Sequence, residues 1–140
     1  MALPARLLLD IVTPDRLLVR EEVDEVQVPG AEGYLGVLPG HAPLLATLTV
    51  GEIWYRTGQD KHHLAIAGGF VEVLPARVTI LAQIAERAHD IDVSRAEAAR
   101  KRAEERLARP SPDFDMERAR VALVKSLIRL QVASRARTRA

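Results

Sequence analysis

The feature that most constrains this chain of 140 residues is an abrupt change of composition at Ala85. All eight glycines and the runs of β-branched residues lie before that point, whereas Ala, Arg and Glu dominate after it. Short apolar runs broken by Gly and Pro are typical of strands and turns, and Ala-rich charged sequence favours helices. The sequence therefore predicts an all-β domain, residues 1–88, followed by a helical region, residues 89–140.

The first domain is expected to consist of short strands joined by tight turns. Gly33–Gly51 contains two apolar runs on either side of Pro39-Gly40, so we expect two strands that double back around that turn. Lys61–Ala67 and Phe70–Leu74 are expected to be separate strands, with a bulge or a close backbone approach at Gly68-Gly69. Because no helix-length segment separates the runs, we predict an antiparallel β-sandwich of about ten short strands.

Two helices are expected to form a hairpin in the second region. Asp92 is a suitable N-cap for the first helix, with Ser94 and Glu97 as a competing capping box, and Asp113 or Asp115 is expected to cap the second. Two prolines between the helices end the first one. The residues expected to meet across the hairpin are Ala96, Ala99, Ala103 and Leu107 in the first helix and Met116, Ala119, Leu123, Leu127 and Leu130 in the second.

Composition excludes several classes of protein. There is no cysteine, hence no disulfide, and no apolar run approaches the roughly 20 residues of a membrane-spanning helix. A formal net charge of +1 gives no overall field to attract nucleic acid, although Arg135, Arg137 and Arg139 make the C-terminal end basic. We therefore expect a soluble, non-exported protein that does not bind nucleic acid.

No catalytic constellation is found in the sequence. The four histidines lack metal-ligand spacing, so no metal site is predicted. Gly33, Gly36 and Gly40 are not followed by Gly-Lys-Ser/Thr and do not open a helix, which favours turns over a phosphate loop. We predict a non-enzyme; a small β-sandwich hydrolase would need a nucleophile and base that we do not find.

Two segments carry a resemblance to a known family. Leu35–Pro43, Leu-Gly-Val-Leu-Pro-Gly-His-Ala-Pro, and Ala67–Val73, Ala-Gly-Gly-Phe-Val-Glu-Val, resemble the N-terminal domain of the epsilon subunit of F-type ATP synthases. The charged helical hairpin has its counterpart in the same family. The resemblance implies a non-catalytic rotor subunit, peripheral on the cytoplasmic face of a bacterial plasma membrane, that needs no cofactor and couples proton flow to ATP synthesis.

The resemblance also implies partners for each domain. The sandwich would dock on the gamma subunit and the membrane c-ring, and we look first to Gly33–Pro43 and Gly68–Phe70 for that surface. The helical arm would regulate ATP hydrolysis: when extended, its basic residues would approach acidic surfaces of the alpha/beta catalytic head. Those residues are Arg118, Arg120, Lys125 and Arg129. The alternative interpretation is a nucleic-acid-binding or other interaction module with a basic tail, for which stacking aromatics are few.

A regulatory ATP site is implied by a short motif at the foot of the hairpin. Ile91-Asp92-Val93-Ser94-Arg95-Ala96 resembles the Ile/Leu-Asp-x-x-Arg-Ala motif of nucleotide-binding epsilon subunits. In this interpretation Asp92 meets the adenine edge and basic side chains bind phosphates. The alternative is that Asp92 is only a helix cap. The candidate ATP-binding residues are Glu86, Ile91, Asp92, Arg95, Ala96, Arg102, Lys125 and Arg129.

Overall fold

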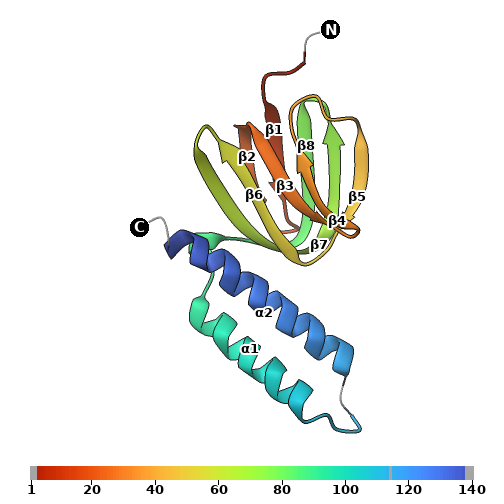
Figure 1. Ribbon diagram of the computed structural model, residues 1–140, viewed down its shortest axis with the longest axis vertical. Helices are drawn as coiled ribbons and strands as arrows, with labels where there is room; N and C mark the ends of the chain where they lie inside the picture. The colour runs from red at the N-terminus through yellow and green to blue at the C-terminus, as the bar shows by residue number, and fades with distance from the viewer. Residues whose placement is uncertain (1–2, 114, 138–140) are drawn as a thin grey trace. The chain divides into compact units, whose positions relative to one another are not determined.

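The computed structural model describes residues 3–113 and 115–137, which form two compact units, Met1–Glu86 and Arg87–Ala140. The first unit is an all-β sandwich and the second is a pair of helices (Figure 1). The strands are β1 Leu7–Val12, β2 Leu17–Val23, β3 Glu25–Gly30, β4 Gly33–Val37, β5 Leu44–Leu48, β6 Gly51–Thr57, β7 Asp60–Leu74 and β8 Arg77–Arg87. The predicted fold class, a β-sandwich followed by an α-helical hairpin, is confirmed.

The strands follow the order β2-β1-β8-β7-β5-β3-β4, and β6 pairs with β3 and β7. Most pairs are antiparallel; β1 and β8 are parallel. The long strand β7 pairs with β6 along residues 60–66 and with β5 along residues 69–73. One strand therefore belongs to both halves of the sandwich.

The continuity of β7 corrects the expected strand count, because eight strands replace about ten in the described residues. Gly68 and Gly69 do interrupt the regular geometry, with φ of 78° and 126°. A Cβ at Gly69 would overlap the Leu81 carbonyl oxygen, so only glycine allows β7 and β8 to approach so closely. The chain bends there and continues as the same strand.

The expected pairing around Pro39-Gly40 is wrong. Both strands form, but β4 pairs with β3, whereas β5 pairs with β7 and meets β3 only at Leu48 opposite Gly30. The two-residue Ala31-Glu32 turn joins β3 to β4 directly. As the next strand in sequence, β4 therefore pairs with one side of β3, and β5 cannot pair there. The segment after β4 then carries the chain to the other half of the sandwich.

An aliphatic core fills the sandwich, as the scarcity of aromatics predicts. Leu9, Ile11, Ile53 and Ile80 are among the fully buried side chains. Tyr55 is the largest of them, and its hydroxyl donates to Glu21 at 3.3 Å. These strands bury their apolar sides so completely that the sandwich forms a core of its own.

In the second unit, a short 3₁₀ turn at Ala88–Asp90 precedes α1 Val93–Ala108 and α2 Met116–Arg137. Helical composition begins at Ala85, but β8 runs on to Arg87, where sheet pairing overrides helix propensity. Asp92 and Asp115 are the N-caps: their carboxylates accept from the Arg95 and Arg118 backbone N–H groups, each at 3.0 Å. None of the helices, over the described residues, is long and apolar enough to span a membrane.

The seam between α1 and α2 is narrower than the predicted stripe. Apart from Val132, which is fully buried in α2, its buried residues are small and recur every seven positions: Ala96 and Ala103 in α1, and Ala119, Ser126 and Ala133 in α2. Ala99, Leu107, Leu123 and Leu130 are half-buried beside it, whereas Met116 and Leu127 are exposed. Leu127 lies about 100° around the helix from Ser126, which turns it away from α1. The alanines expected on α1 are therefore confirmed at the centre, whereas on α2 small side chains occupy the centre that leucines were expected to fill.

Candidate functional site

Four basic side chains share one side of the helical hairpin. Each directly precedes a buried seam residue: Arg95 before Ala96, Arg102 before Ala103, Arg118 before Ala119 and Lys125 before Ser126. A residue one position before the seam lies about 100° from it. In an antiparallel pair, the two-fold relation between the helices puts such positions on the same side, so α1 and α2 together form one cationic face.

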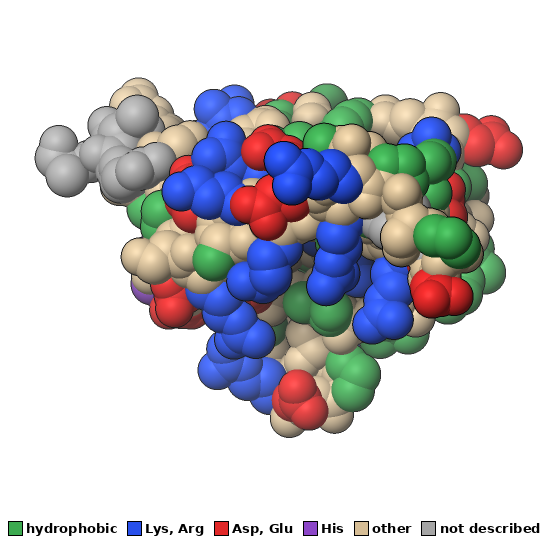
Figure 2. All heavy atoms as spheres, turned by 90° about the horizontal axis from the view of Figure 1, so that it is seen from below, with side chains coloured by type: hydrophobic (Ala, Val, Ile, Leu, Met, Phe, Trp, Pro, Cys, Tyr) green, Lys and Arg blue, Asp and Glu red, His purple; other side chains and the backbone are tan. Residues whose placement is uncertain are grey.

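Arg129 extends this face, because it lies one helical turn after Lys125. Arg95 and Arg102 are exposed, and Lys125 and Arg129 are half-buried. Figure 2 shows Lys and Arg side chains gathered on the surface seen from below, with Asp and Glu among them. The hairpin can therefore present several guanidinium groups and an ammonium to one polyanionic ligand.

A hollow of about 450 Å³ lies on α2 beside two of these cations. Val121 and Ala122 give it an apolar lining, and Arg118 and Lys125 line it as well, together with Asp115 and Glu117. Arg118 was not among the predicted nucleotide contacts. The signal that would have identified it is its position immediately before Ala119, the same position that Arg95 and Arg102 occupy relative to their alanines.

The residues predicted to bind ATP differ in their surroundings. Asp92 is the N-cap of α1, and its side chain is exposed. Ile91 and Ala96 are buried, so their contribution is packing. Glu86 is half-buried near the end of β8 and belongs to the first unit, whereas the other seven residues belong to the second. Within the second unit, the structure therefore brings Arg95, Arg102, Lys125 and Arg129 to one side of the hairpin.

The net charge of +1 hides a strong division between the two units. Residues 1–86 contain six basic and 11 acidic residues, a net charge of −5, whereas residues 87–140 contain 14 basic and eight acidic residues, a net charge of +6. Of the three arginines expected to make the C-terminal end basic, Arg139 lies outside the described residues. The second unit thus provides the cationic surface of this chain.

The sandwich carries exposed apolar side chains. Within the two segments predicted for docking, Tyr34, Leu38 and Phe70 are each more than half exposed. Leu45, 72% exposed, was missed. On β5 and β7, Leu45 pairs with Glu72 and Thr47 with Phe70, so Leu45 and Phe70 share a face of the sheet. The signal available in the sequence was the apolar run on β5. A strand with only one face in the core must expose the apolar side chains of its other face to solvent.

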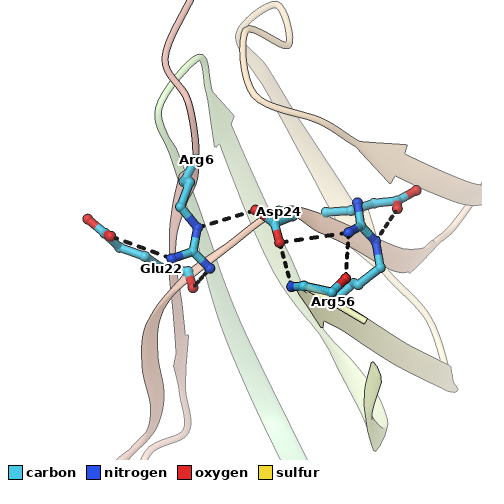
Figure 3. A network of polar contacts seen from close by, with 6 residues as sticks. Arg6, Glu22, Asp24 and Arg56 are labelled. Atoms are coloured by element: carbon cyan, nitrogen blue, oxygen red, sulfur yellow. Dashed lines mark hydrogen bonds and ion pairs between the residues drawn. The ribbon is translucent and has the colours of Figure 1, made fainter. Parts of the chain in front are cut away.

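Ion pairs on the sandwich have structural roles. Asp24 lies at the β2–β3 junction, 3.3 Å from Arg6 Nε and 3.7 Å from Arg56 Nη1 (Figure 3). The Gly58 backbone N–H donates to Asp24 at 2.6 Å, and this bond is the main reason why the pKa of Asp24 lies below its usual value. Asp24 thereby fastens the β6–β7 turn to the N-terminal strands.

A second carboxylate, Asp10, is buried between two arginines. Arg20 Nε donates to it at 2.8 Å and Arg77 Nη2 at 2.5 Å. The hydrogen bond from Arg20 lowers the pKa of Asp10 most; burial opposes this effect, and Arg77 adds to it. Asp10 therefore ties β1 to β2 and β8. Among the described residues, no three His, Asp or Glu side chains are grouped as a metal site would require.

Comparisons with known proteins agree over both units. The beta-sandwich domain of the ATP synthase Delta/Epsilon chain matches residues 6–88, and the long alpha-helix domain of the same chain matches residues 89–134. The "ATP synthase epsilon chain" of Solibacter usitatus is 47% identical over 133 residues, covering 95% of this chain and 99% of the relative. That of Syntrophobacter fumaroxidans is 52% identical over 127 residues, covering 91% and 95%.

A solved structure has the same fold. A chain in the cryo-EM structure of the Euglena gracilis mitochondrial ATP synthase, OSCP/F1/c-ring in rotational state 1, aligns with a TM-score of 0.82. The alignment covers 99% of this chain and 84% of that chain at 23% sequence identity. At this identity the likeness describes the fold alone.

Proposed function

The chain belongs to the ATP synthase epsilon chain family, and on that premise we propose that it is a non-catalytic rotor subunit whose helical arm regulates ATP hydrolysis. Its sandwich docks on the gamma subunit and the c-ring, and helps couple proton flow to ATP synthesis. The complex holds it, as a peripheral subunit, on the cytoplasmic face of the bacterial plasma membrane. The exposed apolar side chains Tyr34, Leu45 and Phe70 support a docking role for the sandwich.

The observation that carries the regulatory part is the cationic face of the hairpin. Arg95, Arg102, Arg118 and Lys125 lie on one side of a seam made of alanines and a serine. Each buried methyl group contributes only about 0.8 kcal/mol, so a narrow seam of this kind separates at modest cost. The arm then extends, and its cationic face approaches acidic surfaces of the alpha/beta head and blocks rotation.

Regulatory ATP binds the folded hairpin in this proposal. Its phosphates are met by Arg95, Arg102, Lys125 and Arg129, while Asp92 or a neighbouring backbone group meets the adenine edge. Because these groups face one side only while α1 and α2 are paired, ATP binds the folded arm better than the extended one. Each tenfold excess of ATP over its dissociation constant then stabilises the folded arm by about 1.4 kcal/mol.

Hydrolysis by the assembled enzyme tests the regulatory role. We expect that removing the residues after Ala88 raises ATP hydrolysis, while the subunit remains bound to the rotor through its sandwich. A full-length variant with Arg118→Ala, Arg120→Ala, Lys125→Ala and Arg129→Ala should show the same release. Hydrolysis that stays at the parent rate in both would contradict an inhibitory arm.

Calorimetric titration with ATP tests the nucleotide site. Arg95→Ala and Arg129→Ala should each lower the affinity at least tenfold. Lys101→Ala is the matched control, since Lys101 is an exposed α1 cation that lies two positions before Ala103, about 160° around the helix from the seam and outside the cationic face. Equal losses of affinity in all three variants would mean that ATP binding depends only on the net charge of the hairpin. If the parent chain shows no heat of binding at millimolar ATP, there is no nucleotide site and Asp92 acts only as a helix cap.

A further inference from the structure

The two edge strands of the sheet are protected to very different degrees. At one end of the strand order, β2 carries Arg20, Glu21 and Glu22, charges of the kind that discourage pairing with another chain. At the other end, β4 reads Gly-Tyr-Leu-Gly-Val and has no charged residue. An uncharged, partly apolar edge of this kind is suited to receive another strand.

The register fixes which backbone groups of β4 face the open edge. Pro29 lies opposite Tyr34, has no N–H, and its carbonyl accepts from Thr49 on the β5 side. The bonds between β3 and β4 therefore run through the alternate pairs, Gly30 with Gly33 and Val28 with Leu35. Tyr34 and Gly36 consequently direct their N–H and C=O groups away from β3.

The edge of β5 is open in the same way. The Thr47 carbonyl accepts from the Ala31 N–H, so odd-numbered residues of β5 direct their backbone groups away from β7. Leu45 has this orientation and, among the described residues, no strand pairs with it on that side. The halves of the sandwich thus end in two neighbouring open edges.

A groove of about 510 Å³ lies between these edges. Residues 30–35 and 44–47 line it, and Glu32 is the one charged side chain among them. Leu35 and Ala46 connect its floor to the core, while Tyr34 and Leu45 stand at the rim, 57% and 72% exposed. The Tyr34 ring is held in place because its hydroxyl accepts from the Glu52 N–H at 3.2 Å.

We propose that this groove binds an extended segment of the gamma subunit by strand addition to β4, with an apolar side chain of that segment between Tyr34 and Leu45. This inference rests on the proposed rotor function and adds the mode of docking. Over the part of the chain that the structure describes, no strand pairs with β4 on the side of Tyr34 and Gly36, so their backbone groups select an extended chain. The apolar lining selects apolar side chains at alternate positions. A second copy fits less well, since its own β4 has glycine at residues 33 and 36 and would leave the groove unfilled.

Amide hydrogen exchange of the full chain, free and bound to gamma, measures strand addition directly. The amides of Tyr34 and Gly36 should exchange at least 100-fold more slowly in the complex, because they gain partners there. Amides of β2 provide the internal control and should not change. Slowing confined to other parts of the sandwich would overturn the proposal.

Matched variants separate backbone pairing from general contact. Gly36→Pro removes the outward donor and should weaken gamma binding at least tenfold, whereas Gly36→Ala should stay within twofold, since its Cβ meets nothing within 4 Å. Leu45→Ser should weaken binding about tenfold, and Leu17→Ser on β2 should not. If Gly36→Pro does not fold, Leu45→Ser and the exchange data decide.

The outcomes distinguish this inference from the function on which it rests. A parent chain that does not bind gamma at all contradicts the proposed function. Normal gamma binding by Gly36→Pro and Leu45→Ser leaves that function standing and overturns strand addition. The proposal is also overturned if these variants lose only c-ring binding, or if they only dissociate a dimer of this chain.

Discussion

The sandwich and the hairpin bury their apolar surface with different side chains. Large aliphatic residues such as Leu9, Ile53 and Ile80 are fully buried in the sandwich, whereas the residues buried in the two helices are alanines, Ser126 and Val132. The sandwich is acidic, the hairpin is basic, and their net charges are −5 and +6. The difference indicates a well-packed docking module and an arm whose helices separate more readily.

The largest expected effect comes from removing part of the sandwich core. Ile80→Ala should lower the free energy of unfolding of the sandwich by about 2–5 kcal/mol, because it leaves a cavity among packed strands. Trp54 is the single tryptophan and lies on β6, so its fluorescence during urea unfolding reports this unit alone.

The matched change in the hairpin is Ala103→Gly, which should cost about 1 kcal/mol through helix propensity and lost packing. It should shift the circular dichroism of the helices without shifting the Trp54 transition. If each substitution moves both signals equally, the two units unfold as one and the comparison between them fails.

The next effect concerns the buried carboxylate of the sandwich. Asp10→Asn should cost about 1–3 kcal/mol at pH 7, because Arg20 and Arg77 lose their ionised partner. Since the folded pKa of Asp10 is lowered, this contribution is fully present above the unfolded value of about 3.9 and is lost as pH falls through the folded value. Urea unfolding between pH 7 and pH 2.5 should show the difference between parent and variant shrinking only below about pH 4.

A smaller effect is expected at the foot of the hairpin. Asp92→Ala should destabilise α1 by about 1 kcal/mol, because the Arg95 N–H loses its acceptor, while Asp92→Asn keeps a cap and should change little. Thermal melting followed at a helical wavelength measures both. Equal losses in the two variants would mean that the charge of Asp92, and not its capping bond, stabilises the helix.

The smallest effect is expected on the exposed face of α2. Glu117 and Arg120 form a solvent-exposed pair at 4.0 Å, so Glu117→Gln should change stability by less than about 0.5 kcal/mol. A change above 1 kcal/mol in the same melting experiment would show that α2 depends on surface charge more than the seam implies.

The sequence predicted elements better than their pairing. Apolar runs, glycines and caps identified the β region, both helices and the N-cap Asp92, because those signals are local. The partners of β4 and β5 and the continuity of β7 were not predictable, since they depend on which strands meet across the sandwich. Of the small seam residues, Ala96, Ala103 and Ala119 were predicted, whereas Ser126 and Ala133 were missed because leucines at helical spacing gave the stronger pattern in α2.

The candidate sites, like the fold, were predictable where the signal is local in sequence and not where it depends on how distant elements pair. The family resemblance was sufficient to nominate Arg95, Arg102, Lys125 and Arg129, and the antiparallel seam was needed to see that Arg118 lies on their side. The groove between β4 and β5 could not be predicted from sequence, because its walls come from strands that do not pair with each other. Local patterns identify ligand chemistry, and strand topology determines which surfaces are open.

Native-state hydrogen exchange of the full-length chain tests the central claim most directly, because it measures both units in one molecule. We expect amides in α1 and α2 to exchange through an opening of lower free energy than amides in β1, β7 and β8. Equal opening free energies for helices and strands would contradict it, since the arm would then have no means of separating while the sandwich stays folded.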